Sequence, residues 1–261
     1  MRTELVSEPG DPTRPNEDFA SVGLPASGRG GALVVLDGVT PPKGPTGCLH
    51  SVPWFVSRLG GALTELTVSL PDVPLSEALS LAVARTADSH AHTCDLSHPR
   101  TPQATVVLAR WSERALEYLV LSDSTLLVES PDGAVTVLAD DRLALLPRES
   151  LTTDAHIDAH LRNKEGGFFT AAADPSVAGR AVTGVLRRED VRALAALTDG
   201  ATRWVETFRE GDWTDLFTFV RKEGAQALVT RVRELETADT EREFLGRSKR
   251  HDDASVAFVE L

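Results

Sequence analysis

The chain has 261 residues, of which 41% are hydrophobic and 25% are charged, and its formal net charge is −12. This composition is typical of a globular protein, and the length allows one large domain or two small ones. The acidic balance argues against a nucleic-acid partner, and the absence of a long apolar run or an apolar leader argues against a membrane partner.

The predicted elements begin with an apolar strand at 32–36, "ALVVL". Two helical patterns follow, at 48–67 and 74–92. From 103 to 140, alternating and apolar runs separated by turn residues predict a β-meander. A meander pairs neighbouring strands in antiparallel fashion, so much of the sheet structure is expected to be antiparallel.

A less regular segment follows, and after it come further strand and helix patterns. A strand pattern at 192–200 leads into helical patterns across 201–236, and a last strand occupies 254–261. Strands and helices that alternate in blocks favour an α+β layered fold over strict βαβ alternation. No obvious linker divides the chain, so residues 1–261 are expected to form one domain.

Three Asp-Gly pairs each follow an apolar run, and such pairs commonly mark hairpin turns. Asp132-Gly133 has strand-like residues on both sides, so a hairpin is expected there. Asp37-Gly38 is followed by Val-Thr-Pro-Pro, and proline cannot donate to a sheet ladder. Asp199-Gly200 runs into a helical pattern. The last two pairs therefore need an explanation other than a hairpin.

Carboxylates stand at the ends of three apolar strand patterns, at Asp37, Asp123 and Asp199. A buried unpaired carboxylate is costly, so each should be paired, hydrogen-bonded or metal-bound. Two further acidic pairs are Glu17-Asp18 in "RPNEDF" and Asp252-Asp253 in "RHDDAS". Taken singly, each aspartate is a cap or turn residue as readily as a ligand. Five acidic clusters at strand edges together favour a site for Mg²⁺ or Mn²⁺, which prefer oxygen ligands.

The order of these clusters resembles the metal-dependent Ser/Thr protein phosphatases, the PPM or type 2C family, in their bacterial form. The matching stretches are "NEDF", "VVLDG", "LSDS", "LTDG" and "DDASVAFV", which span residues 14–259. The resemblance implies a four-layer α-β-β-α sandwich, in which two antiparallel sheets are flanked by helix pairs. It also implies a variable flap-like segment over the site, at about residues 163–185.

The resemblance further implies a centre of two Mn²⁺ or Mg²⁺ ions at one edge of the sandwich, with Asp37 bridging them. A hydroxide that bridges the ions would attack phosphorus directly, without a phosphoenzyme. The implied metal ligands are Glu17, Asp37, the carbonyl of Gly38, Asp199 and Asp252.

Three more residues have roles implied by the resemblance: Asp18 holds a coordinated water, Arg14 grips the phosphate, and Asp123 belongs to a third metal site. Several positions depart from the family pattern, among them the spacing of Arg14 from Glu17, Ser122 before Asp123, and the two that follow. Val39 stands where animal members carry a histidine, and Arg203 stands where many members carry an aspartate for the third ion. Asp123 would then lack its partner. Arg203 would fill that space as a built-in cation or grip phosphate.

The function that the resemblance predicts is hydrolysis of phosphoserine or phosphothreonine in a phosphorylated protein substrate. Two alternatives stay open. One is a catalytically weak or inactive phosphatase-like module that binds a phosphoprotein or a regulatory partner, and the other is a hydrolase for a small phosphorylated metabolite. The sequence does not specify the oligomeric state.

A second group of metal-binding residue types lies in "HAHTCDLSH", which contains His90, His92, Cys94 and His98. Three of these are spaced by four and would share one helix face. Pro99 follows, and the spacing matches no common structural zinc pattern, so we favour a solvated helix end over a zinc site. The two cysteines of the chain form no visible disulfide framework, and a reducing cytoplasm is the expected compartment.

Overall fold

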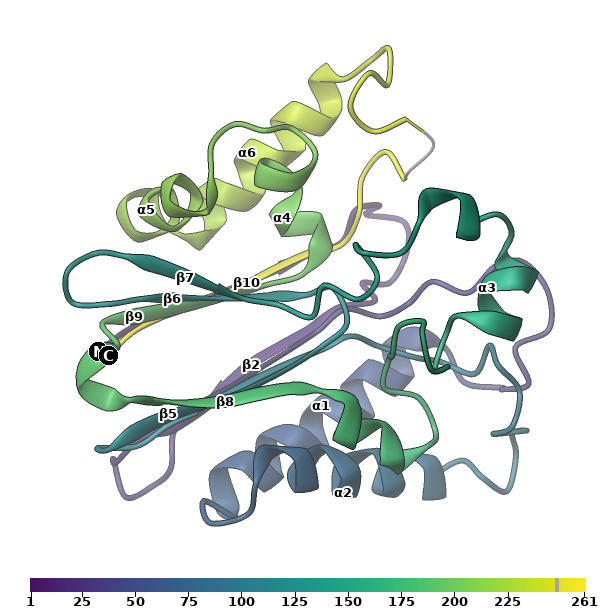
Figure 1. Ribbon diagram of the computed structural model, residues 1–261, viewed down its shortest axis with the longest axis horizontal. Helices are drawn as coiled ribbons and strands as arrows, with labels where there is room; N and C mark the ends of the chain where they lie inside the picture. Colours follow the sequence, from purple (N-terminus) through teal and green to yellow (C-terminus); the bar gives the residue numbers. More distant parts are fainter. Residues whose placement is uncertain (247–248) are drawn as a thin grey trace.

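The computed structural model describes residues 1–246 and 249–261, whose strands form two five-stranded antiparallel sheets (Figure 1). The two chain ends lie together because the first and last strands pair, with Arg2 opposite Glu260. The first sheet has the order β1 (Arg2–Glu8), β10 (Ala254–Glu260), β9 (Ala193–Leu197), β6 (Thr125–Glu129) and β7 (Val135–Leu138). The second sheet has the order β2 (Phe19–Gly23), β3 (Gly31–Leu36), β4 (Val106–Trp111), β5 (Ala115–Leu121) and β8 (Val182–Arg187).

Helices cover the outer face of each sheet (Figure 1). The second sheet is covered by α1 (Val52–Ser69) and α2 (Leu75–Asp88), and the first by α4 (Asp199–Glu206), α5 (Trp213–Glu223) and α6 (Ala225–Ala238). The predicted four-layer α-β-β-α sandwich is therefore confirmed. Within the described ranges, no helix combines the length and apolar character needed to cross a bilayer.

The connection between β7 and β8 lies outside these layers and contains the short helix α3 (Asp154–His160). Short 3-10 helices occur at η1 (Arg148–Ser150) and η2 (Pro175–Arg180) in this connection, and at η3 (Arg188–Asp190) after β8. The flap-like segment expected at about 163–185 falls in this connection and in β8; its role as a flap stays a prediction.

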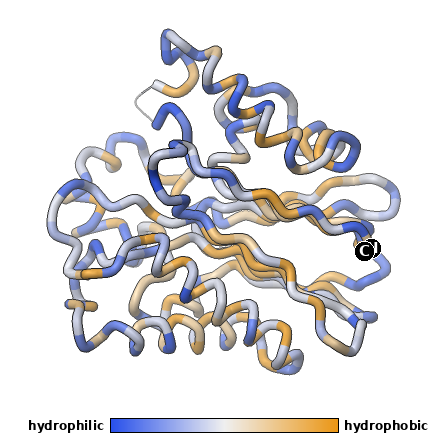
Figure 2. Tube along the Cα trace, turned by 180° about the vertical axis from the view of Figure 1, so that it is seen from behind, coloured by the Kyte–Doolittle hydropathy of each residue, from blue (hydrophilic) through white to orange (hydrophobic). Residues whose placement is uncertain are grey.

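The strand β3 shows how one apolar run serves two cores. Successive side chains of a strand point to opposite faces, so Leu33 and Val35 pack between the sheets while Val34 and Leu36 pack against α1 and α2. All four are buried, and each contributes roughly 2 kcal/mol through burial. Figure 2 shows the same concentration of hydrophobic residues along the paired strands.

Several sequence predictions match the observed elements closely. The four strands predicted from 103 to 140 are β4 to β7, and the hairpin at Asp132-Gly133 joins β6 to β7. They do not form one meander, because β4 and β5 pair in the second sheet whereas β6 and β7 pair in the first, so the chain crosses between the sheets after β5. Gly133 has a φ of +88°, a conformation that favours glycine at a tight turn. The strands β1 and β2 were not expected from the pattern, because neither contains a fully buried residue.

The expectation of a solvated helix end near His90 is wrong. The helix α2 ends at Asp88 rather than at 92, and the His90 side chain is only 2% exposed. Its ring packs edge-on against Trp54 of α1, with 5.1 Å between ring centroids, and its Nδ1 faces the sulfur of Cys48. Likewise α1 begins at Val52 rather than at 48, so Cys48 and His50 lie in the preceding loop.

Candidate functional site

Four aspartates from four different strand ends line one cavity of about 380 Å³. Asp37 follows β3, Asp123 follows β5, Asp199 begins α4 directly after β9, and Asp252 precedes β10. The carboxylates expected at strand ends are thus brought together, as the spacing of the motifs suggested. The remaining wall contains the apolar side chains Val39, Leu143, Leu151, Ile157 and Phe168.

The two unexplained Asp-Gly pairs owe their glycines to close approach of other backbone segments. A Cβ atom on Gly38 would lie 2.3 Å from the carbonyl oxygen of Glu17, and one on Gly200 would lie 2.0 Å from the carbonyl oxygen of Asp253. Both separations are far below van der Waals contact. The missing side chain at Gly38 and Gly200 therefore lets the acidic segments come together at the cavity. Gly133 differs, because there glycine is favoured by the positive φ of a turn.

The buried carboxylates disfavour one another's charge. Burial raises the pKa of Asp37 well above its usual range, and the neighbouring carboxylates of Asp199 and Asp18 raise it further. Burial, followed by repulsion from Asp252 and Asp123, raises the pKa of Asp199 to about 7. Such a concentration of carboxylates under one cavity is electrostatically suited to divalent cations.

Asp18 lies at the base of this group and is almost fully buried. Its Oδ2 accepts a hydrogen bond from Thr198 Oγ1 at 2.9 Å, while its buried Oδ1 has no hydrogen-bond partner among the described residues. Burial raises the pKa of this carboxyl to about 8. A buried acceptor without a partner is costly, and a cation or a cation-held water at Oδ1 would satisfy it. The donor set thus fits a metal centre.

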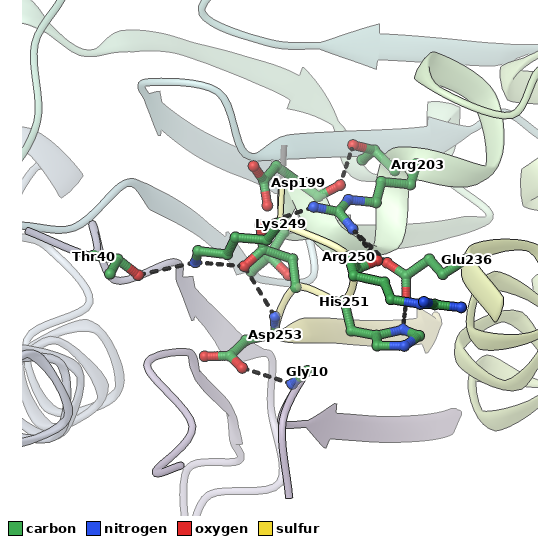
Figure 3. Close-up of polar contacts among 12 residues, drawn as sticks. Gly10, Thr40, Asp199, Arg203, Glu236, Lys249, Arg250, His251 and Asp253 are labelled. Atoms are coloured by element: carbon green, nitrogen blue, oxygen red, sulfur yellow. Dashed lines mark hydrogen bonds and ion pairs between the residues drawn. The ribbon is translucent and has the colours of Figure 1, made fainter. Parts of the chain in front are cut away.

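Glu17 and Asp253 connect the loop after β1 to this site. The backbone N–H of Glu17 donates to Asp253 Oδ2 at 2.7 Å. The backbone N–H of Gly10 donates to Asp253 Oδ1 at 2.8 Å (Figure 3). The Glu17 carboxylate accepts a hydrogen bond from Thr40, which lines the cavity. Asp253 therefore orders the loop that carries Glu17. Arg14, in the same loop, is exposed and does not line the cavity.

Asp252 differs from the other aspartates because two cations of the chain already neutralise it. Its Oδ2 lies 3.0 Å from the guanidinium of Arg203, and its Oδ1 lies 2.7 Å from Lys249 Nζ. Arg203 is buried and also pairs with the fully buried Glu236 at 2.5 Å. Arg203 does not line the cavity that contains Asp123, so this position differs from both roles considered for it, the cation of the third-ion space and the grip on phosphate. It is instead a cation partner of Asp252 and Glu236.

Sequence reasoning missed two cations on the cavity wall, Lys249 and Arg162. Lys249 also donates to Thr40 Oγ1 at 2.9 Å, and it belongs to a short basic run directly before the acidic pair at 252–253. Arg162 follows α3, pairs with Asp158 at 3.5 Å and lies over the ring of Phe168. The basic run was the available signal for Lys249, whereas no local pattern distinguishes Arg162 from a surface arginine.

Comparisons with known proteins agree with this geometry. A family model described as protein phosphatase 2C matches residues 13–235 of the chain. The crystal structure of serine/threonine phosphatase Stp1 from Staphylococcus aureus superposes with a TM-score of 0.62 at 14% identity, covering 99% of this chain and 94% of that one. A search of curated protein sequences found no match.

Two mycobacterial structures are similar to the same extent. The Mycobacterium tuberculosis serine/threonine phosphatase PstP/Ppp gives a TM-score of 0.61 at 18% identity, covering 100% of this chain and 98% of that one. The PPM Ser-Thr phosphatase MsPP from Mycobacterium smegmatis, solved with cacodylate, gives 0.59 at 16% identity with the same coverage. At these identities, the structural likeness establishes a shared fold.

Proposed function

This chain belongs to the protein phosphatase 2C family, and from that premise we propose that it hydrolyses phosphoserine or phosphothreonine in proteins with two divalent metal ions. The observation that carries the proposal is the cavity on which Asp37, Asp123, Asp199 and Asp252 converge. These carboxylates come from strand ends far apart in the sequence, and their charges are only partly neutralised by the chain itself.

The residues proposed to hold the ions are Glu17, Asp37, the Gly38 carbonyl, Asp199 and Asp252, with Asp18 beside them through its unpartnered Oδ1. Asp123 is proposed to belong to a further site. When bound, two Mn²⁺ or Mg²⁺ ions supply water activation and stabilise charge on the phosphoryl oxygens. Asp253 supports this arrangement because it holds the backbone N–H of Glu17.

Binding of the phosphorylated residue is assigned to the cations and the apolar wall of the cavity. Lys249 and Arg162 both line the cavity, and an arginine there can pair with two phosphate oxygens at once. Leu143, Leu151 and Ile157 offer apolar surface beside them. That combination suits a phosphorylated side chain on a peptide better than a small polar metabolite. Arg14 stays a second candidate for the phosphate.

A second function, a phosphoprotein-binding module with little hydrolysis, is favoured by one observation. Both carboxylate oxygens of Asp252 are engaged, one by Arg203 and one by Lys249. A metal ion at this position has to compete with two cations that belong to the chain. If they prevail, the cavity retains a cationic wall for phosphate without a complete metal centre.

Hydrolysis of a phosphothreonine peptide with EDTA, Mg²⁺ or Mn²⁺ tests the proposal. The wild-type protein is expected to turn over only with a divalent ion, and Asp199→Asn is expected to lose about 100-fold or more of that turnover. Asp132→Asn is the matched control, because Asp132 is an exposed aspartate of an Asp-Gly pair outside the cavity. Folded wild-type protein that binds the peptide but shows no metal-dependent turnover would establish the binding module instead.

The substrate class is tested by the same assay with small phosphate esters. The phosphopeptide is expected to be the better substrate by kcat/KM than a sugar phosphate or a nucleotide. The reverse preference would identify a metabolite hydrolase with the same metal centre.

A further inference from the structure

A second cluster of metal-binding side chains lies away from the aspartates, where Cys48, His50, His90 and Cys94 meet. One ligand atom from each of the four lies within 4.8 Å of all the others. Within the described ranges, no other three or more His, Cys, Asp or Glu side chains come this close. The cluster differs from the set weighed in the sequence. His92, which is exposed, and His98 lie outside it, while Cys48 and His50 join from a distant loop.

The sulfur–nitrogen distances in the cluster are close to those of a tetrahedral zinc site. The Cys48 sulfur lies 3.7 Å from His50 Nδ1, 3.4 Å from His90 Nδ1 and 3.1 Å from the Cys94 sulfur, and His50 Nδ1 lies 3.4 Å from the Cys94 sulfur. Tetrahedral zinc, with bonds of about 2.3 Å to sulfur and about 2.0 Å to nitrogen, places a sulfur and a nitrogen roughly 3.5 Å apart and two sulfurs roughly 3.8 Å apart. The two sulfurs therefore have to separate by roughly 0.7 Å when the ion binds. The two sulfurs are also well beyond the length of a disulfide bond, about 2.05 Å.

We propose that Cys48, His50, His90 and Cys94 bind one Zn²⁺ ion as a structural site. Two thiolates and two imidazoles are a common ligand set for structural zinc, and four protein ligands leave no open position for substrate. This inference does not depend on the phosphatase activity, because none of the four residues lines the carboxylate cavity.

The surroundings of the cluster support ligation. The backbone N–H groups of Leu49 and His50 point at the sulfurs of Cys94 and Cys48, at 3.3 and 3.4 Å, and such contacts stabilise thiolates. His90 is buried, and its Nδ1 lies 3.4 Å from the Cys48 sulfur, so the ring presents a nitrogen to the cluster and not to solvent. A buried imidazole nitrogen that faces two thiols is well placed to bind a metal ion.

Trp54 holds both imidazoles in place. The His50 ring stacks on the Trp54 ring with 3.9 Å between centroids, and the His90 ring meets it edge-on at 5.1 Å. Orientation of the rings before metal arrives lowers the cost of binding, because little side-chain freedom is left to lose.

The proposed zinc ion would join two segments that flank the helix layer. Cys48 and His50 precede α1, whereas His90 and Cys94 follow α2, and the segments already share a hydrogen bond from Asp95 N–H to the Gly47 carbonyl at 2.7 Å. The loop that carries Cys48 starts at Gly38, and its residues Val39 and Thr40 line the carboxylate cavity. Zinc would therefore brace this loop from its far end.

Cobalt substitution of untagged, reduced and metal-depleted protein tests the proposal, because a cysteine thiolate bound to Co²⁺ gives a characteristic charge-transfer absorption. Wild type and the control His92→Ala are expected to bind one Co²⁺ per chain with this band, and Zn²⁺ is expected to displace it. Cys94→Ser is expected to lose most of the band. The carboxylate centre cannot produce it, since it contains no sulfur.

Two further measurements keep the test decisive if Cys94→Ser fails to fold. Wild type purified without chelator is expected to contain zinc by elemental analysis, and zinc added to the depleted protein is expected to protect both cysteines from alkylation. The proposal is overturned if the reduced wild type shows neither the cobalt–thiolate band nor protection. It is equally overturned if the two cysteines form a disulfide and the protein, once reduced, takes up no metal at them.

Discussion

The carboxylate cavity and the cysteine–histidine cluster are two sites built on opposite physical plans. The cavity gathers Asp37, Asp123, Asp199 and Asp252 from strand ends, and burial together with repulsion between carboxylates raises the pKa values of Asp37, Asp123 and Asp199. The cluster gathers sulfur and nitrogen atoms from two loops, and backbone N–H groups already support its thiols. The carboxylate cavity suits hard divalent ions that exchange with solvent and act on a substrate. The cysteine–histidine cluster suits a single, permanently bound structural ion.

The two sites should differ in how the loss of a ligand side chain changes the free energy of unfolding. In a metal-free carboxylate site the charged side chains repel one another and lower the free energy of unfolding. Replacing one carboxylate there should therefore stabilise the metal-free protein. A closed zinc site couples binding to folding, so loss of a ligand removes stability. Four predictions follow this comparison, from the largest expected effect to the smallest.

Cys94→Ser is expected to lower the free energy of unfolding by about 3 kcal/mol in the presence of zinc, because binding energy that favours the folded state is lost. His92→Ala should stay within about 0.5 kcal/mol of wild type, as an exposed substitution does. Urea unfolding with Zn²⁺, followed by circular dichroism, measures both. Equal stabilities for wild type and Cys94→Ser would show that zinc does not brace the helix layer.

Gly200→Ala is expected to destabilise the protein by about 2 kcal/mol or more, because the new Cβ would lie 2.0 Å from the Asp253 carbonyl oxygen and backbone must move. Gly133→Ala should cost about 1 kcal/mol, since its Cβ meets no described atom within 4 Å and only the positive φ opposes it. Thermal unfolding of the two variants compares the two kinds of Asp-Gly pair. A cost for Gly133→Ala that equals or exceeds the cost for Gly200→Ala would contradict the close-approach explanation.

Asp199→Asn is expected to stabilise the metal-free protein by about 1 kcal/mol at pH 8, while abolishing function. Burial, with Asp252 and Asp123 adding repulsion, raises the folded pKa of Asp199 to about 7, above its unfolded value of about 3.9. The folded state then binds the proton more tightly, so wild-type stability falls as pH rises from about 4 to about 7. Asparagine does not ionise, and the advantage of the variant should shrink towards pH 5. Urea unfolding of both proteins in EDTA at pH 8 and pH 5 tests the sign of the stability difference between the variant and the wild type.

The α+β class and the carboxylates of the cavity were predictable because each depends on short local patterns, whereas the four-layer arrangement was implied by the family resemblance. An apolar strand that ends in Asp-Gly and then meets Pro41 and Pro42, or a helix, cannot be a hairpin, and the structure places both such pairs at the cavity. Edge strand β1 was missed because an edge strand does not need the apolar run that marks a buried one.

The cysteine–histidine cluster was not predictable from spacing. Cys48 and His50 are separated from His90 and Cys94 by the whole α1–α2 hairpin, and packing of the two helices determines that their loops meet. The pairing of Asp252 with Arg203 was missed for a similar reason, because Arg203 lies in α4 and reaches Asp252 only through the packing of that helix. Lys249 is three residues from Asp252, and its basic run was a local signal that was overlooked.

Lys249→Met is expected to lower the Mn²⁺ concentration that gives half-maximal turnover by about threefold, the smallest of these effects. The ammonium pairs with Asp252 at 2.7 Å but is 45% exposed, so solvent screens the pair and limits what its removal gains. Methionine keeps the length of the side chain without the charge.

Because Lys249 is also assigned to the phosphate, KM for the peptide should rise in the same variant. Titration of Mn²⁺ at fixed peptide, and of peptide at saturating Mn²⁺, separates the two effects. An unchanged Mn²⁺ requirement with a raised KM would mean that Lys249 serves the substrate alone, and that Arg203 is the cation with which a metal at Asp252 has to compete.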